Sequence, residues 1–133
     1  MDGGLALPAR TVALKAVLDA LPGAAGTPMT ASRGSIPIVL IYKVGGKTFA
    51  ILSARREAFV ILKCDPHLAE ILREQYVGVG RRSHLDPRRW ISVDLESDVP
   101  PDEIDRLAAR SYELVRGTLT RKQQAELAAL PGG

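Results

Sequence analysis

Three apolar, partly β-branched segments joined by very short connections constrain the fold of this sequence more than any other feature. They span residues 38–44, 47–53 and 58–63. Gly45-Gly46 offers the positive φ angles of a tight hairpin, and Ala54-Arg55-Arg56 is suited to a second turn. Because parallel strands need a crossover of a dozen or more residues, these short connections predict an antiparallel meander.

Four segments with helical signals surround this meander. Apolar residues spaced i, i+3, i+4 and i+7 predict a helix that starts at Arg10 and ends at Pro22-Gly23. Asp65-Pro66, an N-cap followed by proline at the first helical position, predicts a second helix. Residues 98–117 predict a third helix with acids in its first turn, and the capping-box pattern Thr120-x-x-Gln123 begins a fourth.

A second pair of strands is expected between the second and third helices. Residues 79–84 and 90–95 have strand character, and residues 85–89 are expected to form the turn between them. Residues 22–35 are rich in Gly, Ala, Pro, Thr and Ser, which predicts a connecting loop. The predicted order is therefore α-β-β-β-α-β-β-α-α, with five strands.

The composition is that of one folded domain. The 133 residues are 46% hydrophobic and 25% charged, which is enough apolar material for one core. We expect residues 1–9 to be a flexible leader and residues 10–130 to be the domain. The single cysteine excludes an internal disulfide, and residues 1–10 lack the apolar segment of a signal peptide. No run approaches the roughly 20 apolar residues of a membrane span, so we expect a cytoplasmic monomer without membrane association.

Two patterns resemble ligand-binding motifs but lack essential residues. Gly46-Lys47-Thr48 is the tail of a phosphate-binding loop, yet the required first glycine is replaced by Ile41. Asp94, Glu96 and Asp98 alternate as in a calcium loop, but Val99 stands where the loop needs glycine. The first pattern is explained by a hairpin, and the second by a strand with one solvated face.

Cys64 and His67 are the nearest pair that could ligate zinc or form a nucleophile and its base. A closed zinc site needs four such ligands, and the sequence has no second pair. The charge of the adjacent Asp65 disfavours a Cys64 thiolate. We therefore predict no catalytic residues, no metal, no cofactor and no enzymatic activity. An enzyme would need a deep pocket lined by Cys64, His67 or His84.

Positive charge is concentrated in one segment. The segment from Val77 to Trp90 contains four arginines and one acid, Asp86. Its net charge is therefore +3, which equals the net charge of the whole chain. A guanidinium group donates two parallel hydrogen bonds to a phosphate, and a basic hairpin can lie along a groove of DNA. A solvated arginine-rich loop explains the cluster equally well. The four residues are Arg81, Arg82, Arg88 and Arg89.

Several segments resemble the MmcQ/YjbR family. Residues 60–76, VILKCDPHLAEILREQY, are similar to its central signature, a strand ending in lysine followed by a capped helix. Residues 84–93, HLDPRRWISV, resemble its second signature, a histidine, a turn and a tryptophan-led strand. With residues 42–50 and the closing helix at 98–119, the resemblance covers about residues 40–128. Asp86-Pro87 departs from the usual Asn-Lys, which weakens the expected phosphate contact of that turn.

The resemblance implies an α+β fold with two layers, a five-stranded antiparallel sheet with helices packed on one face, as in secretion chaperones. It also implies DNA binding through a double-wing motif. The two wings would be the hairpins around Gly45-Gly46 and around Asp86-Pro87.

Our leading hypothesis is a non-enzymatic protein that contacts the phosphate backbone of double-stranded DNA with low sequence specificity. The alternative is a protein- or peptide-interaction module with an acidic partner, which an exposed apolar patch on the sheet would favour. The expected DNA-contacting residues are Arg81, Arg82, His84, Arg88, Arg89, Lys43, Lys47 and Lys63.

Overall fold

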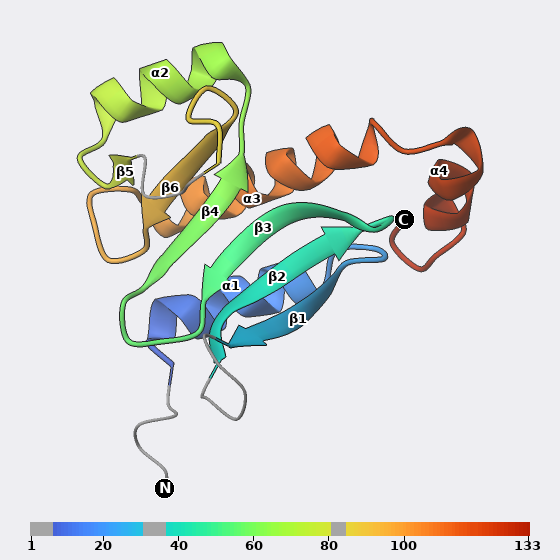
Figure 1. The fold of residues 1–133 in the computed structure, drawn as a ribbon, viewed down its shortest axis with the longest axis horizontal. Coiled ribbons are helices and arrows are strands. Elements are labelled where there is room, and N and C mark those ends of the chain that lie inside the picture. Colours follow the sequence, from blue (N-terminus) through green and yellow to red (C-terminus); the bar gives the residue numbers. More distant parts are fainter. Residues whose placement is uncertain (1–6, 31–36, 81–84) are drawn as a thin grey trace, which may run out of the picture.

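A computed structural model of the chain describes residues 7–30, 37–80 and 85–133, which form helices and one antiparallel sheet (Figure 1). The helices are α1 (Ala9–Asp19), α2 (Pro66–Gln75), α3 (Pro101–Arg116) and α4 (Arg121–Ala128). The strands are β1 (Ala25–Thr30), β2 (Pro37–Val44), β3 (Lys47–Ser53), β4 (Phe59–Lys63), β5 (Val79–Gly80) and β6 (Trp90–Asp94). Their order across the sheet is β1-β2-β3-β4-β6-β5.

The α+β class and the antiparallel sheet are confirmed, but the count of five strands is wrong. The sixth strand is β1, which lies in the segment expected to be a loop and makes the order α-β-β-β-β-α-β-β-α-α. Its sequence, AGTPMT, has little strand propensity, and all six residues are exposed. The strand forms because β2 pairs with it from Ala25↔Lys43 onward. Gly26 permits this pairing, since a Cβ there would lie 2.6 Å from the ring of Tyr42.

The core lies between one face of the sheet and the helices. Figure 1 shows α1 and α3 crossing the far side of the strands, and α2 lying beyond the ends of β4 and β6. Successive side chains of a strand point to opposite faces, so Leu52, Val60 and Leu62 enter the core while their neighbours face away from α1 and α3. From α3, Leu107 and Tyr112 are buried against them.

Helix α3 is joined to the sheet by Ser111, a fully buried residue. Its hydroxyl donates to the carbonyl of Phe49 at 2.5 Å and accepts from the amide of Lys63 at 2.8 Å. The pairing of β3 with β4 ends one step earlier, at Ala50↔Leu62. The serine hydroxyl therefore satisfies the two backbone groups at the point where these strands separate.

We predict that Ser111→Ala destabilises the protein by about 1–3 kcal/mol, because it leaves a part-buried amide and a buried carbonyl without a partner. Urea denaturation at equilibrium measures this loss. The control is Ser53→Ala, a buried serine whose hydroxyl only accepts a 3.3 Å bond from the amide of Arg55 in a turn. Equal losses for the two variants would contradict the bridging role of Ser111.

Candidate nucleic-acid interface

Both predicted hairpins lie at the same end of the sheet. The first closes at Val44↔Lys47, and Lys63, the last residue of β4, pairs with Trp90, the first residue of β6. Because all neighbouring strands are antiparallel, these positions share one end. We call this the wing end, defined by the turn at residues 44–47, Lys63 and the loop at residues 85–89.

The first hairpin has the expected backbone but is packed against α4 and the segment that joins α3 and α4. Gly45 and Gly46 have φ angles of +57° and +81°. The amine of Lys47 donates to the Thr118 hydroxyl at 3.2 Å, and the Gln123 side chain donates to the Gly45 carbonyl at 3.4 Å. These contacts hold the hairpin in place. They also occupy the amine of Lys47 with a hydrogen bond to an uncharged group.

The loop of the second hairpin is organised by Asp86. Its carboxylate accepts from the amide of Arg88 at 3.0 Å, and its carbonyl accepts from the amides of Arg89 and Trp90, also at 3.0 Å. Asp86 thus forms the local turn that its side chain favours. The guanidinium of Arg88 lies 3.7 Å from the same carboxylate, although the Arg88 side chain stays 81% exposed. Aspartate at this position therefore shapes the loop and offsets part of its positive charge.

Arg73, in the last turn of α2, fixes the backbone of this loop. Its guanidinium donates to the carbonyls of Pro87 at 2.6 Å, Trp90 at 2.9 Å and Gly80 at 3.5 Å. This role of Arg73 was not predicted from the sequence, because arginine in the last turn of a helix is ordinarily explained by the helix dipole. Its partners are backbone carbonyls, which carry no signal in the sequence.

A polar pocket of about 400 Å³ separates α2 from the loop. Arg88 and His67 contribute groups that can bind an anion, whereas Glu70 opposes one. His67, which sequence analysis weighed only as a metal ligand or catalytic base, is thus placed beside the second hairpin. The lining residues are Pro66, His67, Glu70, Arg73, Pro87 and Arg88.

The remaining expected contact residues differ in their surroundings. Lys43 and Arg89 are exposed, while Lys63 is half-buried with its amine 6.0 Å from the ring centroid of Trp90. Within the described ranges, Lys63 makes no ion pair with an acid. Arg81, Arg82 and His84 lie outside the described residues.

Two of the three acids that resembled a calcium loop, Asp94 and Asp98, accept hydrogen bonds from backbone amides. The carboxylate of Asp98 accepts from the amides of Val77 and Gly78 at 2.8 Å, and these bonds lower its pKa. Asp94 accepts from the amide of Glu96 at 3.0 Å. No group of three or more potential metal ligands is found among the residues that the structure describes. In the same ranges, no helix is long and apolar enough to cross a membrane.

The fold and the wing end define a small α+β domain with two hairpins at one end of a single sheet. The chain belongs to the YjbR family, whose model matches residues 19–114, and the resemblance noted from the sequence is thereby confirmed. An uncharacterized YjbR protein of Escherichia coli K12 is 34% identical over 71 residues, which are 53% of this chain and 60% of that protein.

Two solved structures are similar. Protein DR2400 of Deinococcus radiodurans, with a DUF419 domain, has a TM-score of 0.76 and 28% identity over 89% of this chain and 86% of that one. A Pseudomonas syringae protein, with a TM-score of 0.56 and 22% identity over 68% of this chain and 86% of that one, shows the fold alone. These relatives establish the family and the fold.

We predict that Arg73→Ala loosens the loop at residues 85–89 without unfolding the domain. The variant removes charge-assisted bonds to carbonyls, and such bonds contribute about 1.5–3 kcal/mol when they are not screened by solvent. Hydrogen exchange at the amides of Arg89 and Trp90 should therefore accelerate. Arg106→Ala on α3 is the control, since its ion pairs are confined to that helix. Unchanged exchange in Arg73→Ala would show that the loop holds its shape independently.

Proposed function

We propose that the protein binds double-stranded DNA through its phosphate backbone, without catalysis and with little sequence preference. The observation that carries this proposal is the display of Arg88 and Arg89, both exposed, on a loop whose backbone is fixed by Arg73. A guanidinium on a fixed backbone loses little conformational entropy when it binds a phosphate. The proposal requires the cytoplasmic location expected from the sequence.

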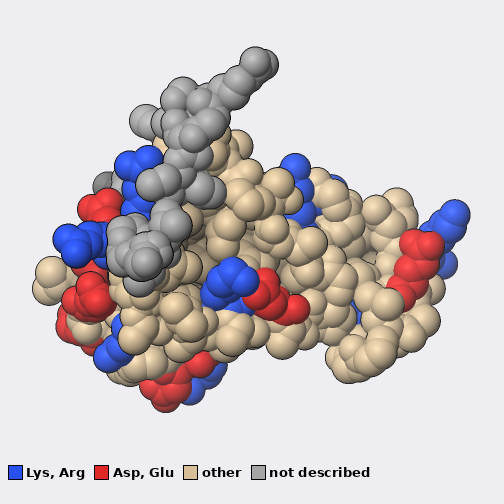
Figure 2. Space-filling view, turned by 90° about the horizontal axis from the view of Figure 1, so that it is seen from below, with Lys and Arg blue, Asp and Glu red and all other residues tan. Residues whose placement is uncertain are grey.

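The distribution of charge supports the wing end as the contact surface. Lys43 adds an exposed amine near the first hairpin, at the same end of the sheet. Figure 2, in which the molecule of Figure 1 is seen from below, shows lysines and arginines beside acids on that face rather than in one basic patch. Because the described wing end offers few free cations and Asp86 offsets one of them, we expect weak binding that falls steeply with salt.

The test is the fluorescence anisotropy of a labelled DNA duplex, titrated at several salt concentrations. We predict that Arg88→Ala/Arg89→Ala weakens binding and reduces the log–log salt slope by up to about 1.8, at about 0.9 per lost phosphate contact. The matched control is Arg55→Ala/Arg56→Ala. It removes the same charge from exposed residues in the β3–β4 turn, at the other end of the sheet.

Equal losses of DNA affinity in the two double variants would indicate that binding responds to net charge alone. That result would contradict a specific contact at the wing end. A folded wild-type protein that fails to bind the duplex even at low salt would exclude DNA as the partner.

A second candidate function, peptide binding, is favoured by the sheet face that α1 and α3 leave uncovered (Figure 1). Ile41, Ile51 and Ile61 are directly opposite one another across three strands and form an apolar row. Ile41 and Ile51 are half-buried and Ile61 is buried, with 8% of its surface exposed, although none of the three belongs to the core cluster under the helices. Lys43 and Lys63 follow two residues later on the same face, so the row is bordered by positive charge. Such a surface complements a peptide that combines apolar and acidic side chains.

We predict that, if this face binds peptides, display selection on the wild-type protein enriches segments with apolar and acidic residues. Ile51→Thr, which keeps a β-branched side chain but removes apolar area, should abolish that enrichment. Enrichment that persists in Ile51→Thr, or an absence of acidic residues in the selected peptides, would exclude the isoleucine row as the binding surface.

A further inference from the structure

A second pocket of about 400 Å³ is lined by residues from the start of α2, the middle of α3 and the end of β4. Its volume is within the usual range of small-molecule sites. Five aliphatic residues line it: Leu68, Ile91, Leu107, Ala109 and Leu114. Leu114 is 42% exposed. The pocket therefore presents apolar surface that the protein itself does not cover.

The floor of the pocket includes Cys64, which is buried. Burial and the charge of Asp65 raise the pKa of its thiol, while the Arg110 guanidinium lowers it by a smaller amount. The thiol is therefore protonated at neutral pH and adds to the apolar surface rather than serving as a nucleophile. Arg110 lines the same pocket.

Some charged side chains around the pocket already have a bonding partner within the described residues, and others do not. The carboxylate of Asp65 accepts from the amides of His67 at 2.9 Å and Leu68 at 3.3 Å, and so caps α2. In the described part of the chain, neither Lys63 nor Arg110 forms an ion pair with a carboxylate. Arg110 thus remains beside an apolar cavity, together with one acid, Glu113. The Lys63 amine lies 6.0 Å from the Trp90 ring, on the face of β4 that also carries Ile61.

We propose that this pocket binds a small amphipathic monocarboxylate. Its apolar body would contact Leu107 and Leu114, and its carboxylate would be bound by Arg110. Glu113 disfavours a second negative charge on the ligand, so a monoanion fits better than a phosphate monoester. The proposal is independent of DNA binding, since neither Arg88 nor Arg89 lines this pocket.

The test is a titration of the labelled protein with octanoate, followed by amide chemical shifts. We predict saturable shifts at Cys64, Leu68, Leu107 and Leu114. Octanamide, which lacks the charge, and octyl phosphate, which carries more of it, should each bind at least about tenfold more weakly. Arg110→Gln should lower the affinity for octanoate by a similar factor. Leu114→Gln, a substitution at an exposed position, should also weaken octanoate binding.

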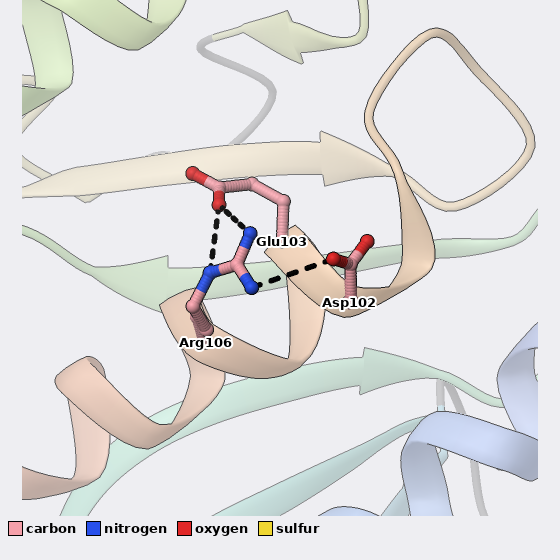
Figure 3. A network of polar contacts seen from close by, with 3 residues as sticks. All are labelled: Asp102, Glu103 and Arg106. Atoms are coloured by element: carbon pink, nitrogen blue, oxygen red, sulfur yellow. Dashed lines mark hydrogen bonds and ion pairs between the residues drawn. The ribbon is translucent and has the colours of Figure 1, made fainter.

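Arg106→Gln is the matched control, because it removes the same charge one helical turn earlier on α3. Arg106 lies outside the pocket and donates to Glu103 at 2.7 Å and to Asp102 at 3.4 Å (Figure 3). It should bind octanoate like the wild type. Equal affinity for octanamide, unchanged affinity in a folded Arg110→Gln, or no saturable shift at millimolar octanoate would each overturn the proposal.

Discussion

The arrangement of the wing end depends on one buried hydroxyl group. Ser111 bonds the carbonyl of Phe49 and the amide of Lys63 at the point where β3 and β4 stop pairing. Beyond this point β4 continues with β6 alone, through the Lys63↔Trp90 pair and a 2.7 Å bond from the Cys64 amide to the Arg89 carbonyl. The separation of the strands places the two hairpins on different sides of the wing end. It also creates the space between α2 and α3 in which the apolar pocket lies.

The two hairpins are both held in place, but by different means and with different consequences. The first packs on the segment after α3 through Lys47 and Gly45, which leaves Lys43 as its free cation in the described ranges. The second is fixed from behind by Arg73, and its own arginines point into solvent. A surface with one such loop suits a weak electrostatic contact with phosphates better than specific recognition of bases.

The local signals in the sequence predicted much of the fold. The Asp65 N-cap, the Thr120 capping box and the positive φ angles at Gly45-Gly46 are all present, because each depends on residues that are adjacent in the chain. Strand β1 was missed because its formation depends on β2 rather than on its own composition. The role of Arg73 was missed for a similar reason, since the carbonyls that it binds lie 7 to 17 residues away in sequence. The cluster of arginines was visible, whereas the support of the loop that carries them was not.

The most direct test of the proposed DNA contact is a map of amide shifts on addition of a short DNA duplex at low salt. The proposal predicts that the changes concentrate at Lys43, Arg88 and Arg89, and that Ile51 and the turn with Arg55 and Arg56 change little. Shifts centred on the isoleucine row, or no shifts at all in the folded protein, would contradict the assignment of the wing end as a DNA-binding surface.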